Sequence, residues 1–182
     1  MIPTRDICLK LFDLHKLPTQ KKIHVEEVAR LAKFFASKIK IKNPNVKINM
    51  ELVEAAALLH DIDKNVTKRE GERHPDTAVR IMKELGFTEL VDIIRKHSVH
   101  CILNPELTPT TWEEKLVFLS DKMVKYELIG VDHRFKLWYK EQLPPQAVAE
   151  LDAAYPKVKA LEKEILDACG LTFNELQTEL HA

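Results

Sequence analysis

The chain contains 182 residues, in which 28 lysines and arginines balance 28 aspartates and glutamates. A chain of this length can form one domain with a hydrophobic core that needs no disulfide bond or structural metal. The zero net charge argues against a nucleic-acid duplex as a partner, because proteins that bind one usually carry a basic excess. The sequence has no run of about 18 apolar residues, so no membrane partner is expected.

Helical periodicity dominates the sequence, which contains only four glycines. We therefore predict an all-α fold, a bundle of about eight helices. The first helix is predicted over residues 5–15 and the second over residues 19–41. His24 lies on the apolar face of the second helix, which the fold is expected to bury. The other members of this face are Val28, Leu31, Phe35 and Ile39.

A third helix is predicted from Asn49, a favourable N-cap residue, to His60. Its alanine-rich sequence allows a neighbouring backbone to approach closely, so that His60 and Asp61 are expected beside the core at its C-terminal end. Residues 63–73 are strongly charged and have no apolar period. They predict a surface loop.

His74 is predicted to cap a fourth helix, in which Pro75 occupies the first turn and which Gly86 ends. Thr88 is predicted to cap the next helix, and His97 lies on the apolar face of that helix. The apolar members of the face are Leu90, Ile93 and Ile94. Both histidines are therefore expected at inward positions.

Thr111 and Glu114 match a capping box that follows a proline-containing loop over residues 104–110. The helix that they begin carries Asp121 on an otherwise apolar stripe. The apolar members of the stripe are Val117, Val124 and Leu128. Asp121 is thus a second carboxylate that the helical pattern directs toward the core.

Prolines divide the C-terminal part of the chain, where helices are predicted over residues 131–143, 146–155 and 157–169. Pro156 is expected to separate the last two helices, and Gly170 to end the last one. Thr172 and Glu175 form a second capping box, which predicts a short tail helix.

No linker, repeat or low-complexity segment divides the sequence, so we expect a single domain over residues 1–182. Residues 5–135 form its motif-bearing core, and the helices of residues 136–182 are expected to pack on that core. The three cysteines are widely spaced without a CxxC motif, and residues 1–17 do not resemble a signal peptide. A cytoplasmic protein is therefore expected. Its oligomeric state stays open, with a homodimer among the expected forms.

Six residues with metal-binding side chains lie at positions that the helical pattern directs inward. They are His24, His60, Asp61, His74, His97 and Asp121. Burying such groups costs several kcal/mol each unless partners or ions compensate. Imidazole and carboxylate ligands without thiolate suit Fe, Mn, Co, Zn or Mg. Six ligands exceed the need of one ion with an open position, and they suit two divalent ions bridged by Asp61.

Two such ions can activate water and stabilise the oxygens of a phosphoryl group. Lys64 follows the His-Asp pair by one turn, and Lys122 and Lys125 flank Asp121. These lysines are expected to hold an anionic group beside the metals. His100 is expected at the surface, and Trp138 is expected to pack against the bundle.

The order and spacing of these motifs resemble the HD-domain metal-dependent phosphohydrolase superfamily over about residues 5–135. The residues that carry the resemblance are His24, the segment Leu58-Leu59-His60-Asp61-Ile62-Asp63-Lys64, His74, His97 and Asp121. The resemblance implies an all-α fold and a metal core made of His24, His60, Asp61 and Asp121. His74 and His97 are similar to the extra histidines of the branch with two metals.

Within that branch, residues 56–64 are similar to YqeK-type hydrolases, which cleave diadenosine tetraphosphate symmetrically. Residues 119–122 and Arg134 also resemble that group. Asp63 stands where the common pattern has glycine, and Ser120 where it has alanine. The resemblance implies that Lys64, Lys122 and Arg134 bind the substrate.

We therefore expect a metal-dependent phosphohydrolase that acts on a nucleotide, a dinucleoside polyphosphate or another small phosphate ester. Asp61 is expected to bridge the ions and orient the attacking hydroxide, and Lys64 to steady the phosphate. Two alternatives stay open. One is a di-iron oxygenase of the same superfamily, and the other is a non-catalytic HD module that binds a nucleotide and signals by dimerising.

Overall fold

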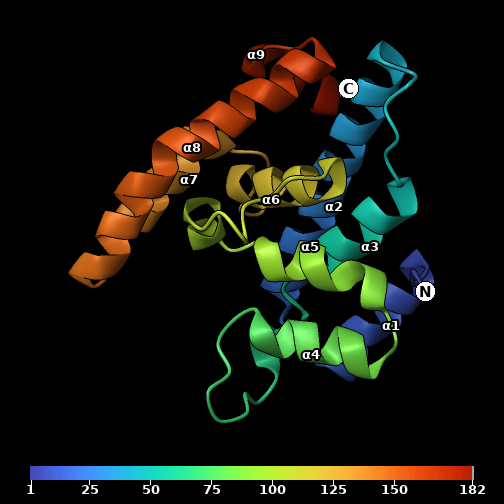
Figure 1. Cartoon of the computed structure of the whole chain (residues 1–182), viewed down its shortest axis with the longest axis vertical. Coiled ribbons are helices and arrows are strands. Elements are labelled where there is room, and N and C mark those ends of the chain that lie inside the picture. The colour runs from blue at the N-terminus through green and yellow to red at the C-terminus, as the bar shows by residue number, and fades with distance from the viewer. Residues whose placement is uncertain (182) are drawn as a thin grey trace.

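Helices joined by short turns make up the computed structural model, which describes residues 1–181 (Figure 1). Within these residues the α-helices are α1 (Arg5–Leu14), α2 (Thr19–Lys42), α3 (Met50–Leu59), α4 (Asp76–Glu84), α5 (Val91–Lys96), α6 (Trp112–Met123), α7 (Gly130–Tyr139), α8 (Pro145–Cys169) and α9 (Phe173–His181). Short 3₁₀ helices are η1 (Ile62–Asn65), η2 (Thr88–Leu90) and η3 (Val99–Leu103). The predicted all-α fold is confirmed, with nine α-helices in the described residues where about eight were predicted.

The second helix, α2, is central to the packing, because it contacts α3, α6 and α8. Its buried face includes the predicted apolar residues, and His24 is buried among them. The alanines of α3 are also buried, which brings the backbone of this helix close to its neighbours. Figure 1 shows α8 along one side of the molecule and α4 at the opposite end.

The predicted helix caps are largely confirmed. The side chain of Asn49 accepts a hydrogen bond of 3.1 Å from the Leu52 N–H at the start of α3. Both bonds of the Thr111–Glu114 capping box are present at the start of α6. Gly170 ends α8 with φ of +70°, a left-handed conformation that glycine adopts without steric cost.

Pro156 does not separate two helices, which corrects the prediction. It lies inside α8, a single helix of 25 residues. A proline in a helix interior removes one hydrogen bond and costs about 3 kcal/mol. Pro156 is solvent-exposed, and an unbroken buried stripe runs past it on the other side of the helix. The residues of this stripe are Leu151, Ala154, Val158, Leu161, Ile165 and Cys169. Packing along this stripe outweighs the local cost.

Three other boundaries differ from the predictions. Thr88 begins the 3₁₀ turn η2 without a capping hydrogen bond, and α5 starts only at Val91. His74 lies two residues before α4, so it does not cap that helix. The helix α6 ends at Met123, and Val124 lies beyond its end, where it forms an isolated bridge with Leu128. Among residues 1–181, no helix combines the length and apolar character that crossing a membrane requires.

Candidate metal centre

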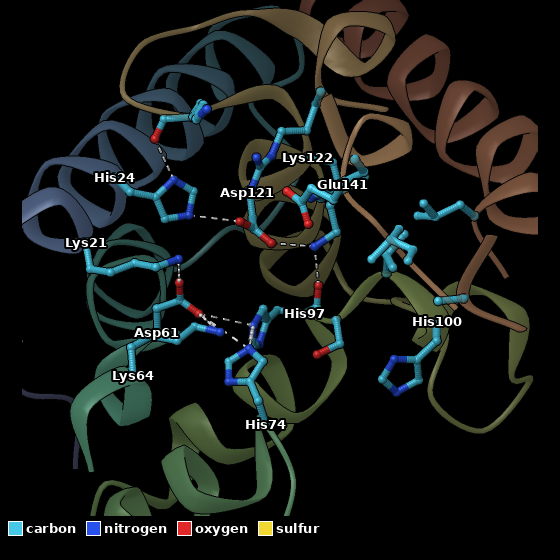
Figure 2. Close-up of a pocket in the computed structure, with 18 of the residues that line it drawn as sticks. Lys21, His24, Asp61, Lys64, His74, His97, His100, Asp121, Lys122 and Glu141 are labelled. Atoms are coloured by element: carbon cyan, nitrogen blue, oxygen red, sulfur yellow. Dashed lines mark hydrogen bonds and ion pairs between the residues drawn. The ribbon is translucent and has the colours of Figure 1, made fainter. Parts of the chain in front are cut away.

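The six predicted ligands come together at one place, from five separate parts of the chain. Figure 2 shows all of them except His60. His24 extends from α2, His60 and Asp61 follow α3, His74 precedes α4, His97 follows α5 and Asp121 belongs to α6. All are buried except His74, which is half-buried. The packing of the helices therefore creates one polar cluster inside an apolar core.

Asp61 lies in the middle of this cluster. Its Oδ1 atom is 3.4 Å from the Nε2 atom of His74. The same oxygen is 3.9 Å from Nε2 of both His60 and His97. A single carboxylate oxygen thus faces three imidazoles, which is the position expected of a bridging ligand.

Asp121 forms the other half of the cluster. Its Oδ1 atom is 3.0 Å from Nε2 of His24 and 3.6 Å from Nε2 of His60. Donor atoms of His24, His60 and Asp121 all lie within 4.8 Å of one another, and so do those of His60, Asp61 and His97. Because His60 belongs to both groups, the arrangement suits two neighbouring ions.

The hydrogen bonds of the Nδ1 atoms show which nitrogens are free to bind a metal. Nδ1 of His24 lies 2.9 Å from the Lys125 carbonyl oxygen. Nδ1 of His60 lies 2.7 Å from the Ala57 oxygen, and Nδ1 of His97 lies 2.6 Å from the Ile94 oxygen. A carbonyl oxygen only accepts, so Nδ1 must donate, and Nε2 of the neutral ring carries the lone pair. Metal-binding histidines are oriented by the same kind of hydrogen bond.

Among the described residues, the Nε2 atoms of His60, His74 and His97 then lack a hydrogen-bond donor as partner. Nε2 of His60 is buried without a hydrogen bond among the described residues. Nε2 of His74 lies only 2.9 Å from Nε2 of His97. Two facing lone pairs at this distance repel unless a cation or a proton lies between them. The donor set therefore fits divalent metal ions, with His24, His60 and Asp121 on one side and Asp61, His74 and His97 on the other.

The electrostatics of the carboxylates also suit a metal. Burial opposes the charged form of Asp61, but His60, Lys64 and Lys21 together hold its pKa well below the ordinary value. Burial likewise opposes ionisation of Asp121, but Lys122, His24 and His60 together hold the pKa of Asp121 well below the ordinary value. Both groups are therefore ready to coordinate without losing a proton first.

The pKa values of two histidines are shifted in opposite directions. Burial, aided by the nearby positive charge of His60 and His74, holds the pKa of His97 well below the ordinary value. Burial also acts against a charge on His60, but the adjacent Asp61 and Asp121 raise its pKa. The negative field that favours a proton on His60 equally favours a divalent cation beside it.

Lys21 belongs to the site, although the sequence analysis missed it. Its Nζ donates a hydrogen bond of 2.8 Å to Oδ2 of Asp61, while Nζ of Lys64 lies 3.2 Å from Oδ1. Lys21 precedes His24 by one turn of α2. That spacing was the available signal, but the same helix contains other lysines without a role in the site.

Lys122 lies deeper than its predicted substrate role suggests, because only 2% of its surface is exposed. Its Nζ pairs with Oδ2 of Asp121 and donates a hydrogen bond of 2.5 Å to the His97 carbonyl. Both interactions are inside the protein. The position of Lys122 therefore favours a role in holding Asp121 and the end of α5, although Lys122 also lines the pocket described below.

Asp63 corrects the prediction of a surface loop over residues 63–73. It belongs to η1 and is buried, with 2% of its surface exposed. Its carboxylate oxygens lie 2.9 and 3.1 Å from Nδ1 of His74. The charged residues around Asp63 in the sequence concealed this position. The loop itself begins after η1.

A pocket of about 820 Å³ opens onto the metal ligands. Lys21, Lys64 and Lys125 line it near these ligands, and Arg134 of α7 also lines it. The guanidinium of Arg134 lies 4.7 Å from the ring centroid of Trp138, and its Nε is buried without a partner among the described residues. His100 is exposed at the pocket and lies apart from the cluster of candidate metal ligands (Figure 2).

We predict that replacing either His74 or His97 with alanine lowers the metal content from near two ions per chain toward one. Each variant removes one Nε2 donor on the Asp61 side, while His24, His60 and Asp121 stay intact. Metal analysis of the purified variants, with circular dichroism as the control for folding, measures the effect. An unchanged ratio would reduce both residues to structural histidines.

Comparisons with known proteins show which family the chain resembles. A family model described as HD domain matches residues 22–125, a range that includes all six ligands. An uncharacterized protein of Methanocaldococcus jannaschii is 30% identical over 95 residues, which are 46% of this chain and 55% of that protein. The chain thus spans about half the length of that curated relative. The comparison with solved structures gives no match.

Proposed function

The chain belongs to the HD domain family, and we propose that it is a metal-dependent phosphohydrolase acting on a nucleotide, a dinucleoside polyphosphate or another small phosphate ester. The observation that carries the proposal is the convergence of four imidazole Nε2 atoms and two ionised carboxylates at one end of a lysine-lined pocket. Proteins of this family are typically metal-dependent hydrolases. The substrate class is proposed in addition, from the residues that line the pocket.

The residues have distinct roles in this reaction. When bound, divalent ions supply activation of water and stabilisation of charge on phosphoryl oxygens. Asp61 touches both ligand groups, so it fixes their relative position. Lys64 lies at the pocket beside Asp61 and is placed to bind a phosphate oxygen as a point charge. Lys21, on the other oxygen of Asp61, adds a second positive charge at the same place.

The other end of the pocket supports a nucleotide as substrate. Trp138, Leu143 and Leu151 line it there, on or next to the C-terminal helices α7 and α8. Ligand sites of this kind combine an apolar wall with a few placed polar groups. Trp138 packs on Phe135, with ring centroids 5.0 Å apart, and Arg134 lies over Trp138. The half-buried Trp138 ring at the pocket suits contact with a nucleobase, and the YqeK-like motif supports diadenosine tetraphosphate as one substrate.

We predict that replacing Trp138 with alanine raises KM for nucleotide substrates by about tenfold, since contact between a base and an aromatic residue contributes 1–3 kcal/mol. KM for a simple phosphate ester without a base should not change. Tyr139→Ala is the matched control, because this neighbouring aromatic residue does not line the pocket. Equal effects on both kinds of substrate would contradict a base-binding role.

The experiment that tests the proposed function compares hydrolysis with oxygen chemistry. Metal-free protein is loaded with Mn²⁺, Co²⁺ or Fe²⁺ and assayed with and without oxygen. A hydrolase needs only water, so release of phosphate or mononucleotide should continue without oxygen and with Mn²⁺ or Co²⁺. Activity that requires both iron and oxygen, with an oxidised product and no phosphate ester cleaved, would make the chain an oxygenase.

A further inference from the structure

Three of the four histidines at the metal centre donate Nδ1–H to a backbone carbonyl. His60 and His97 both follow the last residue of a helix, α3 and α5 respectively, and each faces the carbonyl three residues earlier. The last carbonyls of a helix have no partner within the helix. For these two histidines, the end of the preceding helix therefore supplies the carbonyl oxygen that accepts the Nδ1 hydrogen bond.

His74 lacks such an acceptor, because it precedes a helix instead of following one. Its Nδ1 faces the two carboxylate oxygens of Asp63, at 2.9 and 3.1 Å. The side chain of His74 is also the most exposed of the four, at 24%, compared with 4% or less for the other three. His74 is thus the histidine whose orientation the surrounding packing restrains least.

We infer that Asp63 is a positioning residue that holds His74 with Nδ1 protonated and Nε2 directed toward an ion shared with Asp61. A buried carboxylate costs several kcal/mol unless it is compensated. Among the described residues, both hydrogen bonds of the Asp63 carboxylate go to His74. A cation on the other side of the same ring completes the compensation. Carboxylate–histidine–metal arrangements of this kind fix the ring and raise the basicity of the ligating nitrogen.

Geometry separates this role from direct ligation by Asp63. Donor atoms of Asp61, Asp63 and His74 lie within 4.8 Å of one another. However, the oxygens of Asp63 face Nδ1, whereas Nε2 of His74 faces Asp61 at 3.4 Å and His97 at 2.9 Å. Asp63 therefore lies behind the imidazole relative to the other ligands. The inference rests on the proposed function only in requiring an ion beside Asp61.

The test is a Co²⁺ titration of the metal-free full chain, followed by visible absorption and calorimetry. The variants are Asp63→Ala, which removes the acceptor, and Asp63→Asn, whose amide oxygen can still accept from Nδ1. Asp92→Asn is the control, because Asp92 is an exposed carboxylate that pairs only with Arg95 among the described residues. In Asp63→Ala, the affinity for one of the two Co²⁺ ions should fall about 10- to 100-fold, as it does when other residues that orient a metal ligand are removed. In Asp63→Asn, the affinity for the same ion should fall less. Asp92→Asn should bind both Co²⁺ ions as the unmodified chain does.

Three results would overturn the inference. If metal binding falls as much in Asp63→Asn as in Asp63→Ala, Asp63 is a direct ligand, because a neutral amide binds a divalent ion far more weakly than a carboxylate does. Normal binding of both ions by both variants would leave Asp63 with a structural role only. An unmodified chain that binds a single ion, unaffected by either variant, would also contradict it. If circular dichroism shows that Asp63→Ala does not fold, Asp63→Asn decides alone. A lower affinity for one of the two ions then supports the inference, and unchanged binding overturns it.

This outcome is independent of the hydrolase assignment. A chain that releases no phosphate from any substrate, but loses one Co²⁺ ion in Asp63→Ala, would support the role of Asp63 and overturn the proposed reaction. If the chain hydrolyses phosphate esters but both Asp63 variants bind the two ions normally, the proposed reaction is supported and the role of Asp63 is overturned.

Discussion

Replacement of Asp61 with alanine is expected to abolish turnover and to strip metal from the protein. Oδ1 of Asp61 faces His60, His74 and His97, so its removal takes a ligand from both halves of the centre. Loss of a residue that merely orients a ligand weakens metal binding about 10- to 100-fold, and loss of a bridging ligand should exceed that. Metal analysis and a phosphate-release assay on the same preparation measure the two effects.

The control for this variant is Asp92→Ala, which removes an exposed carboxylate from α5 outside the site. The fold of Asp61→Ala should survive, because Lys21 and Lys64, the two cations released, are both partly exposed and can be solvated. Full metal content and a near-normal rate in Asp61→Ala would show that the centre has been assigned wrongly.

Replacement of Lys122 with methionine is expected to destabilise the metal-free protein by about 3–5 kcal/mol, because it leaves a buried carboxylate without its partner. Lys122 pairs with Asp121 and also donates to the His97 carbonyl, all in the interior. Added divalent metal should recover part of the loss, since the ion compensates the charge of Asp121. Urea unfolding with and without metal gives the free energy of unfolding in each state.

The double variant Lys122→Met, Asp121→Asn provides the matched control. It removes both charges of the pair, so the metal-free protein should be clearly more stable than Lys122→Met alone. Metal should no longer stabilise it to the same degree, because Asp121 is a ligand. If the free energy of unfolding of Lys122→Met falls by less than about 1 kcal/mol, the pair with Asp121 contributes no more than a surface ion pair does. That result would contradict the buried role of Lys122.

Much of the metal centre could be predicted from the sequence, because a helix has a fixed period. His24 interrupts an apolar stripe of α2 that is buried as expected. Asp121 is buried in α6 with Val117, whereas Val124 and Leu128 of its predicted stripe are buried beyond the end of that helix. His60 and His97 lie at helix ends, where free carbonyls orient their rings. The pattern could not show how close the five segments lie, since that depends on packing between helices.

The residues that were missed have a physical reason in common. Lys21 and Asp63 each belong to the site because they contact one candidate ligand, Asp61 and His74 respectively. Such a contact produces no periodic pattern in the sequence. Asp63 is also surrounded by charged residues that are exposed. Pro156 misled the prediction for a different reason, because local propensity was outweighed by packing of α8 along its buried stripe.

The most direct test of the account is a titration of metal-free protein with Mn²⁺ in the absence of oxygen, with phosphate or mononucleotide release measured at each step. The substrates are nucleotides, diadenosine tetraphosphate and simple phosphate esters. Release is expected to rise with added metal, to saturate near two ions per chain and to stop when a chelator is added. No release from any substrate at any metal ratio, or an unchanged rate after the metal has been removed, would contradict the account.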